Sequence, residues 1–139
     1  MKTVEIFGGT LLCDIEATEQ AYVGHESYAV TCPCIPCKNY LAVREKYFPR
    51  NAIEALGQLG IDFKRDIEVY HMAKVEGLHV YGVWFYFVGG ISKEPAYQDS
   101  IAFLEGGKWL PPSFQNKPLV TVDMQLRLPW EIALEEPRQ

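Results

Sequence analysis

The sequence lacks several features that would assign it directly to a functional class. Its longest apolar run, 78–91, is shorter than the roughly 20 residues that a membrane-spanning helix needs, and it contains His79. The net charge is −5, so the chain has no overall basic excess of the kind that nucleic-acid binders carry. We therefore expect neither a membrane nor a nucleic acid as its partner.

The first residues, Met1 to Glu5, also lack the apolar segment of a signal peptide. A cytoplasmic location is the resulting expectation, and reducing conditions there disfavour structural disulfides. Clustered cysteines in such a protein more often bind metal or perform redox chemistry.

What is present fits one globular domain spanning residues 1–139. Hydrophobic residues make up 48% of the chain and charged residues 22%, which is ordinary for a folded protein. The length suffices for a sizeable core. No internal repeat, low-complexity tract or linker divides the sequence.

Alternating residues at the N-terminus predict a β-hairpin around Gly8-Gly9, with Val4 opposite Cys13. Residues 21–31 favour a third strand that leads into the cysteines.

Helical spacing then predicts two consecutive helices, at about 36–48 and 52–59. Pro36 suits the first turn of a helix, Pro49 ends the first helix, and Gly60 suits the residue that follows the second.

The C-terminal half predicts further antiparallel strands. Residues 67–74 and 78–88 form a hairpin around Glu76-Gly77, Gly89-Gly90 ends its second strand, and 119–128 forms the last strand. The expected fold class is therefore α+β: an antiparallel β-sheet of hairpins with the two short helices packed on one side.

Three of the four cysteines, Cys32, Cys34 and Cys37, fall within six residues as C-x-C-x2-C. The Cys34–Cys37 spacing is common in zinc sites, and the helix dipole favours a thiolate at Cys37. A structural zinc site needs four ligands, so this cluster predicts a site that lacks one.

Two candidates for the fourth ligand are weak. Cys13 lies on the apolar face of its hairpin, which is typical of a small core residue. His25 is remote along the expected third strand. An iron–sulfur cluster would need all four cysteines, Cys13 included, and is therefore disfavoured.

The second hairpin offers the remaining histidines. Its turn pairs His79 with Lys74 and His71 with Gly82, so the two histidines are predicted on opposite faces. His79 shares its face with Glu68 and is the preferred ligand, although a core histidine bonded to the backbone is the competing interpretation. The predicted zinc ligands are thus Cys32, Cys34, Cys37 and His79.

Three-thiolate coordination with water in the fourth position would instead be catalytic, with Glu68 or Glu26 as a general base. No catalytic residue is assigned on this basis, and the chain is not expected to be an enzyme. A second alternative is thiol–disulfide chemistry at Cys34 and Cys37, whose C-x-P-C form occurs at the helix start of thioredoxin-like proteins. The strand order around the motif departs from that fold.

The stretch from Cys32 to Tyr40, followed by 47–49, 59–62 and 77–79, resembles a group of small bacterial proteins of uncharacterised activity. The resemblance covers about residues 30–91. It implies a shared fold and brings no activity with it.

These observations favour a zinc-stabilised binding or regulatory protein whose partner, a protein or a small molecule, is not specified by the sequence. A protein-binding module of immunity or accessory type, with cysteines that merely pack, is the third alternative.

Overall fold

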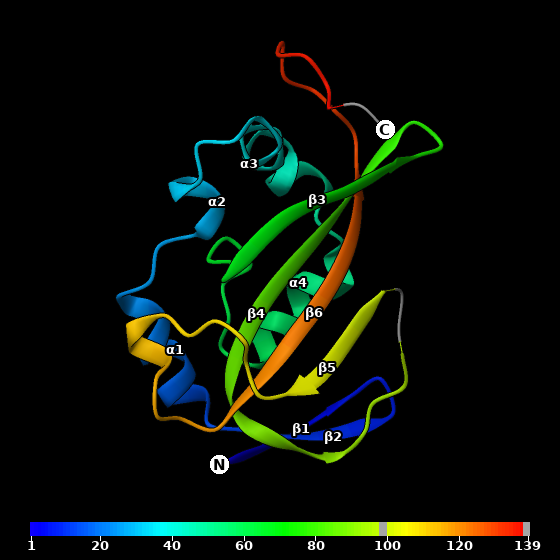
Figure 1. Cartoon of the computed structure of the whole chain (residues 1–139). Helices are drawn as coiled ribbons and strands as arrows, with labels where there is room; N and C mark the ends of the chain where they lie inside the picture. Colours follow the sequence, from blue (N-terminus) through cyan, green and yellow to red (C-terminus); the bar gives the residue numbers. More distant parts are fainter. Residues whose placement is uncertain (98–99, 138–139) are drawn as a thin grey trace.

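The computed structural model describes residues 1–97 and 100–137. That part of the chain forms six strands, four α-helices and one 3-10 turn (Figure 1). The strands build an antiparallel sheet in the order β1-β2-β4-β6-β5, with β3 also paired to β4. The predicted α+β class is therefore confirmed. None of the helices described combines the length and apolarity needed to cross a bilayer.

The elements follow one another along the chain in this order: β1 (Lys2–Ile6), β2 (Gly9–Cys13), α1 (Ile15–Val23), α2 (Tyr28–Thr31), α3 (Ile35–Tyr47), α4 (Arg50–Gln58), β3 (Glu68–Val75), β4 (Leu78–Lys93), β5 (Ile101–Glu105), the 3-10 turn η1 (Pro112–Phe114) and β6 (Leu119–Leu128).

The N-terminal hairpin forms, but its predicted register is wrong by two residues. Val4 pairs with Leu11 rather than with Cys13. The turn is Phe7-Gly8, and both of its residues have positive φ (49° and 76°), as a two-residue hairpin turn of type I′ requires. A shift of two leaves every side chain on its original face, so Val4 and Cys13 are both buried.

The third strand predicted at 21–31 does not exist, because these residues lie in α1 and α2 and in the turn between them. The side chains of Asp14 and Ser27 each accept a hydrogen bond from the backbone N–H three residues further on, which is how a helix N-cap acts. α1 also covers the edge of β4: its Tyr22 hydroxyl donates to the carbonyl of Tyr86 and accepts from its N–H, both at 2.8 Å.

Both predicted helices are confirmed to within two residues, as α3 and α4. Leu59 is the C-cap of α4, and the next residue, Gly60, has φ +81°. The N–H of Ile61 donates to the carbonyl of Leu56 at 2.9 Å, and that of Gly60 to Gly57 at 3.1 Å. This pair of bonds is a Schellman motif. The two helices lie on one side of the sheet (Figure 1).

The core fills the space between these helices and the sheet. Tyr40 of α3 packs on Tyr81 of β4, and Phe48 packs on Phe85, with ring centroids 5.7 and 6.4 Å apart. Tyr40, Tyr81 and Phe85 are completely buried. The odd-numbered side chains of β4 therefore face the helices.

β4 does not end at Gly89-Gly90 as predicted, but continues to Lys93. It pairs with β6 up to Val88 and with β2 from Gly89 onward. A Cβ atom on Gly89 would lie 1.9 Å from the carbonyl oxygen of Leu12, and the φ of Gly89 is +153°. Only glycine permits this close approach, so the residue joins two parts of the sheet instead of ending the strand.

The second hairpin turns at Glu76-Gly77 as predicted, and Lys74 pairs with His79. A β-bulge between His71 and Ala73 then adds one residue to β3. His71 consequently pairs with Tyr81 rather than with Gly82.

The bulge overturns two expectations about side-chain faces. His71 and His79 lie on the same face of the sheet rather than on opposite faces, and their rings are 5.0 Å apart. Glu68, expected beside His79, pairs with Trp84 and shares the opposite face with it.

Candidate metal centre

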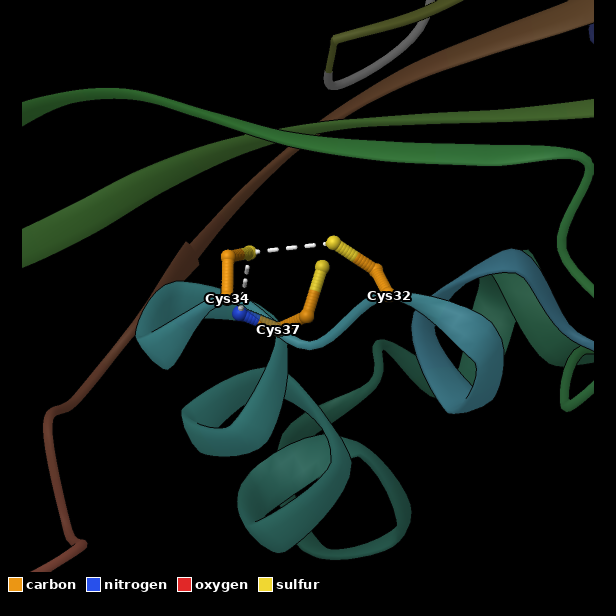
Figure 2. A group of neighbouring side chains, drawn as sticks. All are labelled: Cys32, Cys34 and Cys37. Carbon is orange, nitrogen blue, oxygen red and sulfur yellow. Dashed lines mark hydrogen bonds between the residues drawn. The ribbon is translucent and has the colours of Figure 1, made fainter.

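The three clustered cysteines lie where α2 ends and α3 begins. Cys32 is the C-cap of α2 and Cys34 is the N-cap of α3. Figure 2 shows their three side chains pointing into the same small space. The sulfurs of Cys32 and Cys34 are 3.2 Å apart, and all three sulfurs lie within 4.8 Å of one another. We call this group the cysteine cluster.

Local sequence explains the position of each sulfur. The N–H of Cys37 donates to the sulfur of Cys34 at 3.4 Å, and Pro36 occupies the first turn, where no N–H is needed. This turn brings Cys37 back alongside Cys34. The helix N-terminus carries a partial positive charge, which favours thiolates. At Cys37, however, burial outweighs this effect and raises the pKa, so the expectation of a favoured thiolate at Cys37 is wrong.

The spacing suits a thiolate-bound metal ion. Two sulfurs bound tetrahedrally to one zinc ion at about 2.3 Å would lie about 3.8 Å apart, which is compatible with the cluster's spread. All four cysteines of the chain are free thiols. The cysteine cluster could therefore bind a metal ion, whose identity the geometry leaves open.

The thiols of the cluster differ in acidity. The pKa of Cys32 is lowered, chiefly by the backbone N–H of Cys34, and also by the Cys34, Cys37 and Tyr28 side chains. The pKa of Cys37 is strongly raised, first by burial and then by the neighbouring thiols. Cys32 is therefore the easier thiol to deprotonate, whereas a metal would have to displace a tightly held proton from Cys37.

Asp66 holds the two helices that flank the cluster. Its carboxylate is fully buried, and it accepts from the Ser27 hydroxyl at 2.7 Å and from the Ala29 N–H at 3.1 Å, at the start of α2. The same carboxylate lies 3.5 Å from the guanidinium of Arg44 in α3. Asp66 thus fixes the spacing of the helices that present the cysteines.

β4 anchors the first turn of α3 from the other side. The hydroxyl of Tyr81 donates to the carbonyl of Pro36 at 2.8 Å and accepts from the Asn39 amide at 3.3 Å. The Asn39 side chain also binds the carbonyl of Pro129 and the N–H of Glu131. These hydrogen bonds hold the first turn of α3, and with it the cysteine cluster, against β4 and the segment that follows β6.

His79, the fourth predicted ligand, is fully buried, and it is not among the residues whose ligand atoms meet within 4.8 Å. Its Nδ1 is hydrogen-bonded to His71 at 2.8 Å and its Nε2 to Glu136 at 2.7 Å. We call these three residues the histidine clasp. Trp130 packs on the His79 ring at 4.9 Å. Ligation by His79 stays a prediction.

The other sequence candidates lie apart from the cluster's ligand group. Cys13 is fully buried, and its thiol donates to the carbonyl of Leu59, as expected for a core residue. His25 binds the carbonyl of Asp66 at 3.0 Å. Glu26 is exposed and accepts from the Ser27 N–H.

Sequence reasoning missed Asp66 and Tyr28 altogether. Asp66 acts across 37 to 39 residues of chain, and a lone aspartate before a strand gives no local sign of such contacts. Ser27 carried the only usable signal, because a serine ahead of an apolar run is a common helix start.

The comparisons with known proteins add no function. No family model matches this sequence, and neither the curated proteins nor the solved structures include a significant match. The function must therefore be argued from the geometry of the cysteine cluster.

Proposed function

We propose that the protein binds one zinc ion through the thiolates of Cys32, Cys34 and Cys37. The ion would join the end of α2 to the start of α3 and stabilise a binding or regulatory protein. The convergence of three free thiols within 4.8 Å at a helix N-terminus supports this proposal most directly. Zinc prefers such soft ligands at such distances.

In this proposal the fourth ligand is exogenous, either water or a group from a partner. His79 is a poor choice because both of its ring nitrogens are already hydrogen-bonded. Cys34 is exposed and Cys32 is partly exposed, so the ion would be accessible from solvent. An open position on a zinc ion suits reversible coordination of a partner's side chain or of a small molecule.

Metal analysis of protein purified without a histidine tag tests the proposal. We expect one zinc per chain and a lower melting temperature after chelation, because the ion binds the folded state only. Replacing Cys32, Cys34 and Cys37 together by serine should abolish zinc binding.

Cys13→Ala is the matched control, since it also removes a thiol but should keep the zinc. Protein that carries no zinc, takes up none when zinc is added, and melts identically with and without chelator would refute the proposal.

The contact between the sulfurs of Cys32 and Cys34 favours a second candidate function, reversible thiol oxidation. With oxidised glutathione as the oxidant, the two thiols would give up two electrons and two protons, form a disulfide, and leave two molecules of reduced glutathione. Peptide mapping after this treatment should find a disulfide within the cluster. Uniformly slow alkylation of every thiol in the native protein, with no disulfide formed, would contradict it.

A further inference from the structure

The face of the sheet opposite α3 and α4 carries an unusual row of side chains. The strand register places Trp84 of β4 beside Asp123 of β6, and Asp123 beside Ala102 of β5. Side chains that are neighbours across a sheet share a face. An acidic residue therefore occupies a central strand next to an indole ring.

A pocket of about 370 Å³ opens beside this row, between β4, β6 and the turn that follows β5. Small-molecule sites begin at roughly 300 Å³. Trp84 and Leu104 supply apolar walls, and Lys108 lies on the turn. The Thr121 hydroxyl donates to the carbonyl of Gly106 at 2.6 Å and fixes that turn in place.

Tyr70 holds the indole wall in position. Its ring meets that of Trp84 edge to face, with centroids 6.0 Å apart. Tyr70 occupies the space above Gly82, where an added Cβ would lie only 2.2 Å from the tyrosine ring. The Trp84 Nε1–H is buried and has no aligned acceptor in the described part of the chain. The pocket wall is thus preformed by packing.

Three charged residues line this pocket: Lys108, Asp123 and Glu105, whose side chain strand alternation puts on the other face of β5. Asp123 is half-buried, and burial raises its pKa, while the indole of Trp84 and the ammonium of Lys108 lower it. Among residues 1–97 and 100–137, neither Asp123 nor Lys108 forms an ion pair. A half-buried carboxylate with no cation in direct contact keeps part of its desolvation cost, and such groups mark candidate binding sites.

We infer that this pocket binds a small zwitterion of the amino-acid class. The ligand's ammonium group binds Asp123, its carboxylate binds Lys108, and its apolar side chain lies against Trp84 and Leu104. A ligand with only one charge would leave either Asp123 or Lys108 unpaired. The inference is independent of the zinc proposal, because none of these residues belongs to the cysteine cluster.

Three probes with the same phenyl group separate the contributions of the two charges. Phenylalanine carries both charges, phenethylamine only the ammonium and hydrocinnamate only the carboxylate. In calorimetric titrations we expect phenylalanine to bind about tenfold more tightly than either, the effect of one charge-assisted contact. Equal affinities for all three, a single-charge probe that matches phenylalanine, or no saturable binding of phenylalanine would overturn the inference.

Variants assign each charge to its residue. Asp123→Asn should weaken phenylalanine and phenethylamine but not hydrocinnamate, and Lys108→Gln should weaken phenylalanine and hydrocinnamate but not phenethylamine. Glu54→Gln is the matched control, because it also removes one negative charge, but from an exposed side chain of α4 on the other side of the sheet.

An equal loss of affinity in the Glu54 and Asp123 variants would mean that only the general negative potential matters, and would overturn the inference. Unchanged melting temperatures would show that the variants fold. Binding retained in the cysteine-to-serine triple variant would separate this site from the zinc proposal.

Discussion

The cysteine cluster and the histidine clasp are both built from residue types that bind metals, yet their chemistry differs. Each nitrogen of His79 already has a partner, and the imidazole is completely buried under Trp130. The three sulfurs of the cluster contact one another, backbone N–H groups and the Tyr28 side chain, and two of them reach solvent.

The difference shows that free ligand atoms matter more than residue type. A group whose hydrogen bonds are satisfied by the protein stabilises the fold and must lose them to bind an ion. Neighbouring thiols that lack strong partners gain most from a cation. We therefore propose a structural role for the histidine clasp and metal or thiol chemistry for the cysteine cluster.

The largest effect that would test this division is expected at Asp66. Asp66→Ala leaves the Ser27 hydroxyl, the Ala29 N–H and the Arg44 guanidinium without their buried acceptor. We expect the free energy of unfolding to fall by about 3 kcal/mol, and zinc affinity to fall because α2 and α3 lose their common anchor. Urea denaturation and zinc titration measure both quantities.

Asp62→Asn is the control, because this side chain is exposed and binds only the N–H of Lys64. Its effect should stay within about 0.5 kcal/mol. A D66A protein with unaltered stability would mean that the two helices do not depend on this anchor.

The next largest effect on stability is expected at His79, and it distinguishes the histidine clasp from the cysteine cluster. His79→Ala removes a buried ring and both of its hydrogen bonds, so we expect a loss of about 2 kcal/mol in the free energy of unfolding. The zinc content of the folded variant should stay at the wild-type level. If the folded variant instead loses its zinc, His79 is a ligand and the comparison fails.

We expect zinc affinity to fall more steeply with decreasing pH than the stability contributed by the histidine clasp. In our proposal zinc would have to displace the proton of Cys37, whose pKa is raised by burial and by the neighbouring thiols. Zinc affinity should fall about tenfold per pH unit of acidification for each proton displaced. Competition titrations with a chromophoric chelator between pH 8 and pH 6 would measure this, and a flat profile would argue against thiol ligands.

The smallest effect concerns the clasp. Burial and the neighbouring His79 lower the pKa of His71 below its usual 6.5. Below pH 6.5 the unfolded chain therefore binds a proton that the folded chain does not, so stability falls as the pH drops toward the folded pKa. Denaturant melts at several pH values should show this decline.

His71→Gln should flatten the decline in that window. Glu136 adds a separate loss only below its ordinary pKa of 4.5, because hydrogen bonds from His79 and Lys74 lower its pKa in the folded state. A wild-type profile that stays flat between pH 7 and pH 5 would contradict the role given to His71.

The sequence predicted the parts of the molecule that depend on local signals. Pro36 and the C-x-x-C spacing suffice to place Cys34 and Cys37 at a helix start, because capping and proline preferences act within one turn. The Glu76-Gly77 turn was also predictable from local sequence, because glycine readily adopts the positive φ that a two-residue hairpin turn requires. Both residues of this turn have positive φ.

The rest depends on contacts between distant segments. The bulge between His71 and Ala73 adds one residue to β3. The alternation of apolar and polar residues in the sequence does not indicate this extra residue. That single residue reverses the predicted faces of His71 and Glu68. Likewise, 21–31 has the apolar content of a strand, but the buried Asp66 carboxylate caps α2 from far along the chain.

X-ray absorption at the zinc edge tests the central claim most directly, because it identifies the atoms bound to the metal. We predict three sulfur ligands and one oxygen or nitrogen ligand, with no outer-shell scattering from an imidazole ring. A spectrum with imidazole scattering would return His79 or another histidine to the site. A spectrum without sulfur would show that the cysteine cluster is not the metal centre.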